Sequence, residues 1–143
     1  MCMTVFVAAD HPLPLRPWHK DHPDFHVIAV ADNEKWVKGV FSVPHARYAG
    51  TYEGCGCAFN VGREYPESEY EQPELVAGDE SRKKLYEYIT SNRVQEMFVN
   101  YEENAARSVA SRRKIVAEDI LNKDFVFSEG ELLSIQGTPN QAL

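Results

Sequence analysis

The sequence lacks a long apolar run, an excess of basic residues and a glycine-rich phosphate loop. No apolar stretch approaches the roughly 20 residues that cross a bilayer, and the N-terminus has no basic signal-peptide start, so we expect no membrane partner. The chain carries 22 acidic against 15 basic side chains, and its formal charge of −7 disfavours nucleic acid as a partner. Gly54, Gly56 and Gly62 miss the dinucleotide-binding spacing and no Walker-type lysine follows, so we expect no nucleotide cofactor.

Cysteine is also scarce, with only Cys2, Cys55 and Cys57 in 143 residues. An odd number of cysteines, two of them almost adjacent, is not the framework of a disulfide-stapled secreted domain. We therefore expect reduced thiols and a cytoplasmic location. The sequence assigns no role to Cys2.

Length and composition favour one globular domain over residues 1–136, followed by a flexible tail at 137–143. A chain of 143 residues with 43% hydrophobic side chains is long enough to form one hydrophobic core and too short to form two. Strand patterns at residues 4–9, 26–31, 47–52, 95–101 and 114–117 outnumber helix patterns, which predicts an α+β fold with a mixed, largely antiparallel sheet. We expect the first two segments to be inner strands because both of their faces are apolar, and residues 95–101 to be an edge or half-covered strand. Gly130, between apolar residues 125–127 and 132–135, predicts a hairpin.

An acidic stretch at residues 64–80 separates the predicted strands from the main predicted helix. It contains seven acidic and no basic side chains, together with Pro66, Pro73 and Gly78. Such a composition buries too little apolar surface to offset the entropy of ordering, so we expect a mobile surface loop. Asp79 then fits the N-cap of one main packed helix at about residues 80–91.

The most informative motif is Cys55-Gly56-Cys57, which places two thiols one residue apart on a backbone that glycine allows to bend. Thiolates select soft or borderline metals, so the motif predicts binding of zinc or copper. Further ligands are needed, and the chain offers His19, His22 and then His26 as the nearest cluster of donors, with His45 as a further candidate. His26 lies in a predicted strand, where it could instead be a satisfied side chain, and we expect His11 to be a surface or turn residue.

The same two thiols allow other hypotheses. They could form a strained, easily reduced disulfide, as in a thiol redox protein or sensor. One of them could be a nucleophile, although no family signature supports that role. In a different class of function, the cysteines are packed hydrophobes, and the protein is a non-catalytic interaction or homo-oligomerisation module that uses a strand edge and the acidic loop. The sequence leaves open whether the protein is an enzyme.

Overall fold

The computed structural model describes residues 3–21, 23–51, 59, 72–101, 109–122 and 124–137. These residues form an α+β fold built on one mixed sheet of six strands, as the sequence predicts. The strands are β1 (Met3–Ala9), β2 (His26–Ala29), β3 (His45–Gly50), β4 (Glu96–Tyr101), β5 (Ser111–Val116) and β6 (Glu131–Gln136). The helices are α1 (Gln72–Asn92) and two 3-10 helices, η1 (Asp32–Gly39) and η4 (Ala117–Leu121).

The strands lie in the order β2-β3-β1-β4-β6-β5, so β2 and β5 are the outermost strands. All neighbouring pairs are antiparallel except β5 and β6, which are parallel and are joined through η4. This is the mixed, largely antiparallel sheet that the alternating apolar patterns predict.

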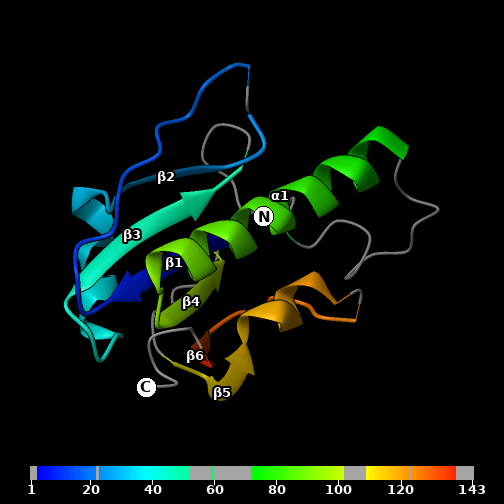
Figure 1. Ribbon diagram of the computed structural model, residues 1–143. Coiled ribbons are helices and arrows are strands. Elements are labelled where there is room, and N and C mark those ends of the chain that lie inside the picture. Colours follow the sequence, from blue (N-terminus) through cyan, green and yellow to red (C-terminus); the bar gives the residue numbers. More distant parts are fainter. Residues whose placement is uncertain are drawn as a thin grey trace.

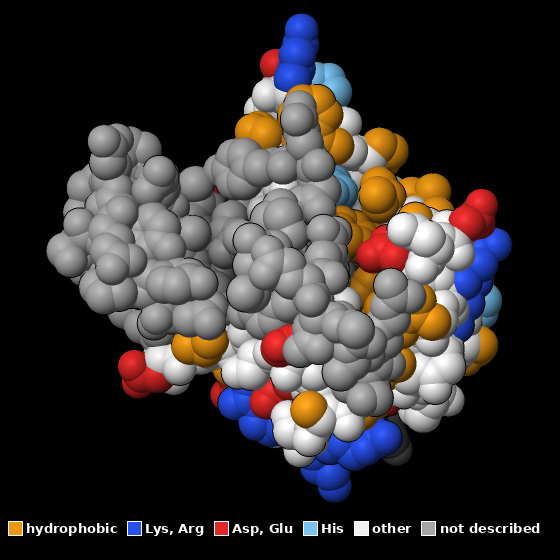
Figure 2. Space-filling view, turned by 180° about the vertical axis from the view of Figure 1, so that it is seen from behind, with side chains coloured by type: hydrophobic (Ala, Val, Ile, Leu, Met, Phe, Trp, Pro, Cys, Tyr) orange, Lys and Arg blue, Asp and Glu red, His pale blue; other side chains and the backbone are white. Residues whose placement is uncertain are grey.

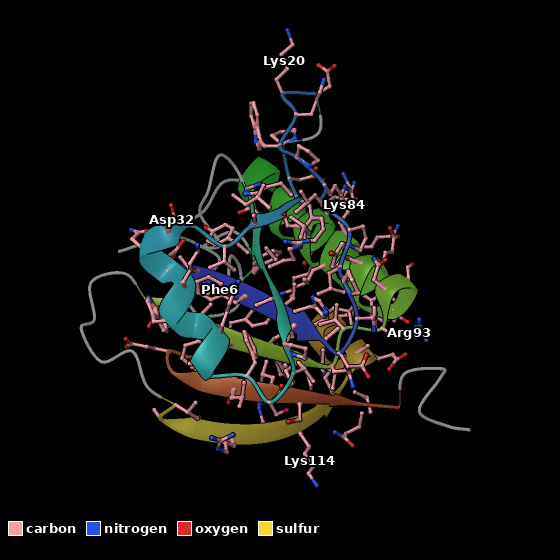
Figure 3. The ribbon with its side chains drawn as sticks, turned by 90° about the vertical axis from the view of Figure 1, so that its left-hand side faces the viewer. Phe6, Lys20, Asp32, Lys84, Arg93 and Lys114 are labelled. Atoms are coloured by element: carbon pink, nitrogen blue, oxygen red, sulfur yellow. The ribbon has the colours of Figure 1, made fainter. Side chains whose placement is uncertain are left out.

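Helices cover both faces of the sheet (Figure 1). Figure 3 shows η1 and α1 on opposite sides of the strands. We call these the η1 face and the α1 face. Because successive strand residues point to opposite faces, Val5 and Val7 of β1 belong to the α1-face core, whereas Phe6 belongs to the η1-face core. On the α1 face, Leu85 and Ile89 of the helix are fully buried, and each such side chain contributes about 1.5–3 kcal/mol through burial.

The expectations for β2 and β4 were wrong, because β2 is an edge strand and β4 is an inner one. The outer edge of β2 is bridged at Val27 by Arg16, through two backbone hydrogen bonds of 2.8 Å, while Ile28 remains 39% exposed. In β4, the buried Glu96 carboxylate accepts hydrogen bonds from both the backbone N–H and the hydroxyl of Ser42, each 2.8 Å long. This pairing offsets the desolvation of a charged residue on an inner strand.

Helix α1 confirms the predicted main helix but begins earlier, at Gln72. The loop expected over residues 64–80 is therefore wrong for residues 72–80, and residues 64–71 lie outside the described part. Asp79 lies within the helix and is not its N-cap. Proline has no N–H, so Pro73 is tolerated in a first turn, and a helical glycine such as Gly78 costs only about 1 kcal/mol.

The predicted hairpin around Gly130 is also wrong. Gly130 has a φ of +74°, as the turn pattern requires, but the chain before it does not form a strand. Phe125 and Phe127 are buried instead in the α1-face core, and β6 pairs with β4 and β5. Burial of two aromatic rings against α1 outweighs local strand pairing at this position.

Within the described residues, no helix combines the length and the apolar character needed to cross a bilayer.

Candidate functional site

The predicted thiol motif lies outside the described residues, as do Cys2 and His22. The structure does describe the chain on either side of Cys55 and Cys57, at Thr51 and at Phe59. Both flanking residues are buried, with exposures of 1% for Thr51 and 0% for Phe59. The motif is therefore joined at both ends to the packed part of the molecule.

Phe59 is held by aromatic rings and by a buried arginine. Its ring lies 6.3 Å from Phe25 and 5.9 Å from Phe127, measured between centroids. Its backbone carbonyl accepts a hydrogen bond from Nε of Arg82, a residue of α1 with no solvent exposure. Nη1 of Arg82 donates to the carbonyl of Ile120 in η4 at 2.8 Å. Arg82 thus ties Phe59, two residues after Cys57, to α1 and η4.

The guanidinium of Arg82 also faces two aromatic rings. Its Cζ lies 5.0 Å from the centroid of Phe127 and 5.5 Å from that of Phe125. Cation–π attraction is strongest where the cation is desolvated. Sequence reasoning missed this residue, because nothing in the pattern of α1 separates Arg82 from its exposed neighbour Lys83.

His19 lies in the proline-rich crossing between β1 and β2, with its side chain 61% exposed. Its Nδ1 accepts a hydrogen bond of 3.0 Å from the backbone N–H of Asp21 and lies 3.6 Å from that residue's carboxylate. Figure 3 places the neighbouring Lys20 at the tip of this crossing, away from the sheet. His19 is accessible, but its described contacts are local.

His45 is the exposed first residue of β3 and pairs with Ala9 of β1. The chain leaves β3 toward Cys55 from the other end, after Gly50. Five strand intervals separate His45 from Gly50, or about 17 Å. His45 therefore lies at the end of β3 away from the residue after which the chain continues toward the thiols.

His26 stands at the end of the sheet from which the chain departs toward the cysteines. It pairs with Gly50 across β2 and β3, is 2% exposed, and stacks on Tyr48 with a centroid distance of 6.0 Å and an interplanar angle of 19°. Its Nδ1 is buried and has no hydrogen-bond partner among the described residues. His26 is therefore a buried strand residue whose Nδ1 is not satisfied by the described part of the chain.

Burial lowers the pKa of His26 below its usual range, since the charged imidazolium is poorly solvated in the sheet. The residue is then neutral near pH 7, which is the form that binds metals. The absence of a side chain at residue 50 is required here, because a Cβ on Gly50 would lie 2.8 Å from Nε2 of His26. Sequence reasoning could not find this pairing, which depends on the register of β2 and β3.

His11 is engaged elsewhere, as expected for a residue in a turn. Its Nδ1 lies 2.8 Å from the carboxylate of Asp10, and its Nε2 lies 2.6 Å from the carbonyl of Asn92 at the end of α1. Among the residues that the structure describes, no three His, Cys, Asp or Glu side chains are grouped so that they could hold a metal ion.

No protein-family model, no curated protein and no solved structure matches this chain.

Proposed function

We propose that the protein binds a soft or borderline metal ion, zinc or copper, through Cys55 and Cys57. The proposal rests on the surroundings of His26. It is a buried, neutral imidazole whose Nδ1 has no partner in the described chain, and it lies opposite the residue before Thr51, where β3 ends. A thiolate pair and a neutral imidazole are ligands that suit zinc and copper.

The remaining histidines contribute less to this proposal. His19 lies in the crossing that leads into β2, and the sequence places His22 only four residues before His26. His22 is therefore the best candidate for a fourth ligand. His45 is the weaker candidate in this proposal, because it begins β3 at the end opposite Gly50.

A location in the cytoplasm is part of the same proposal, because the chemistry requires reduced thiols. A reducing compartment keeps both cysteines available as ligands, whereas an oxidising one favours a strained disulfide between them. A thiol redox role remains the alternative use of the same two residues. The packed-cysteine alternative assigns them no chemistry.

The test is elemental analysis of protein purified without an affinity tag or chelator, followed by reconstitution with zinc and with copper(I). Near-stoichiometric metal in the wild type, lost in a Cys55→Ser, Cys57→Ser double variant, supports the metal site. Reduced binding in His26→Gln, with full binding in the matched control His45→Gln, supports the ligand assignment. If His26→Gln binds as tightly as the wild type, only the role of His26 is wrong.

If the wild type takes up neither metal, the proposal is overturned, and a thiol count separates the alternatives. Two accessible thiols that oxidise reversibly in the native protein favour redox chemistry. Two thiols that react with an alkylating reagent only after unfolding favour packing. Circular dichroism of each variant establishes that it is folded before its metal content is compared.

A further inference from the structure

The free edge of β5 is a basic strip on an acidic protein. β5 is the last strand of the sheet, and within the described residues it pairs on one side only, with β6. It contains Arg112, Arg113 and Lys114, all exposed, in a chain of formal charge −7. Figure 2 shows Lys and Arg side chains gathered at the lower end of the molecule, where Figure 1 places β5.

The three cations divide between the two faces of the sheet. Arg113 is on the α1 face, where its Nη2 donates to the Glu131 carboxylate at 2.8 Å and its Cζ lies 4.7 Å from the centroid of Phe125. Arg112 and Lys114 are on the η1 face and have no ion-pair partner in the described chain. Lys114 points away from the body of the molecule in Figure 3. Within the described residues, two adjacent positive charges on one face therefore have no acidic partner.

The α1 side of the same edge has a different character. An open recess of about 290 Å³ lies beside β5. Its lining residues are Arg113, Lys114, Ile115, Asp119, Asn122, Asp124 and Phe125. Arg113 is already paired with Glu131, and the recess contributes two further carboxylates. Between these charged groups, Phe125 and Ile115 offer apolar surface against which an apolar side chain can pack.

We propose that the free edge of β5 binds an extended segment of a partner protein, in which acidic side chains alternate with apolar ones, as a seventh strand. Strand side chains alternate between the two faces, so such a segment places its carboxylates beside Arg112 and Lys114. Its apolar side chains then point toward the recess. Backbone hydrogen bonds to an edge strand supply affinity and the alternating side chains supply specificity.

Charged residues on an edge strand also prevent edge-to-edge aggregation. That role alone predicts no affinity for an acidic strand. The two readings are compatible at β5, because the same cations that repel the β5 edge of a second copy attract a segment of opposite charge. The proposal is independent of the metal site.

The test uses fluorescence anisotropy at low salt with a short synthetic peptide of alternating glutamate and valine. We expect it to bind the wild type, and a matched peptide of alternating lysine and valine not to bind. The variant Arg112→Glu, Lys114→Glu should lose at least about tenfold in affinity for the acidic peptide and gain affinity for the basic one. Lys20→Glu, Lys83→Glu is the matched control, because it changes the net charge equally at two exposed sites away from β5.

A backbone-modified peptide separates strand addition from simple charge attraction. N-methylation of alternate residues, on the edge facing β5, removes donors while it keeps every carboxylate, so we expect binding to weaken by about tenfold or more. Equal binding of the methylated peptide, or no binding of the acidic peptide, overturns the proposal. Sedimentation of the free protein measures its oligomeric state. If the wild type is a dimer and the Arg112→Glu, Lys114→Glu variant is a monomer, a second copy of the chain occupies the β5 edge, and the proposal is overturned.

Discussion

Replacement of Arg82 by methionine tests the buried contact that fixes the chain after the thiol motif. The substitution keeps an unbranched side chain of similar length in α1 and removes the guanidinium. It deletes the hydrogen bonds to the carbonyls of Phe59 and Ile120 and the contacts with the rings of Phe125 and Phe127. The perturbation is confined to a fully buried site.

Two opposing effects set the magnitude. Each buried carbonyl left without a donor costs about 1–3 kcal/mol, and each lost cation–π contact costs about 0.5–2 kcal/mol. Against this, methionine avoids the several kcal/mol needed to desolvate a charged group. We expect the losses to exceed the gain, and the free energy of unfolding to fall by about 2–4 kcal/mol, a large part of the roughly 5–15 kcal/mol typical of a domain.

Arg82→Lys separates geometry from charge. Lysine keeps the positive charge, but a single ammonium cannot reproduce the planar fork that reaches both carbonyls, and it is harder to desolvate than a guanidinium. We expect Arg82→Lys to destabilise the protein at least as much as Arg82→Met. Lys83→Met, on the adjacent exposed position of α1, is the control and should change stability by less than about 0.5 kcal/mol.

The assay is urea unfolding followed by circular dichroism, with the midpoints compared at constant slope. Stability of Arg82→Met equal to or above that of the wild type would refute the reasoning, since the buried charge would then cost more than its contacts contribute. Full rescue by Arg82→Lys would show that charge alone is sufficient. Either result would remove Arg82 as the residue that positions Phe59.

Two further predictions concern Tyr88 and Gly50. Burial, opposed by the charge of Arg47, raises the pKa of Tyr88 to about 12, and its hydroxyl donates to the carbonyl of Pro14 at 2.7 Å. Because the folded pKa exceeds the unfolded value of 10.0, this stabilisation is complete below pH 10 and is lost as the pH rises toward about 12. The free energy of unfolding of Tyr88→Phe should therefore fall less than that of the wild type over this pH range. Identical pH profiles of the two proteins would contradict the prediction. Gly50→Ala should cost about 1–3 kcal/mol, since its Cβ would lie 2.6 Å from Cε1 of Tyr48, whereas Gly39→Ala, with nothing within 4 Å, should be neutral or stabilising in the same urea assay.

The sequence predicts the fold class because two-sided apolar patterns and one amphipathic helix are local signals. Val5, Phe6 and Val7 alternate between two cores whatever the neighbouring strands are. The order of strands is not local. The segment of β2 is apolar on both faces, yet β2 is an edge strand that is bridged by Arg16. The segment of β4 includes polar residues, yet β4 is enclosed by β1 and β6. Whether a strand is inner or outer depends on which strands it pairs with, and the hydrophobic pattern of a segment does not specify its partners.

The candidate site is less predictable for the same reason. The thiol motif is visible as a spacing of two cysteines, but the relevance of His26 depends on its pairing with Gly50, 24 residues later in the chain. His45 is closer to the motif in sequence and lies at the opposite end of β3. Distance along the chain therefore does not tell which histidine is paired with the end of β3 from which the chain continues toward the thiols.

The two proposals place functions at opposite edges of one sheet, which makes them separable by experiment. Four strands lie between β2 and β5, so the edges are about 24 Å apart. Effects at sites so distant, with no shared partner, normally add within about 0.5 kcal/mol. We therefore expect metal uptake to be unchanged in Arg112→Glu, Lys114→Glu, and peptide affinity to be unchanged in His26→Gln. A combined variant can be compared with the two separate ones. If its loss of metal uptake or of peptide affinity exceeds the sum of the separate losses, the sheet couples its two edges, because β2 and β5 are not in direct contact.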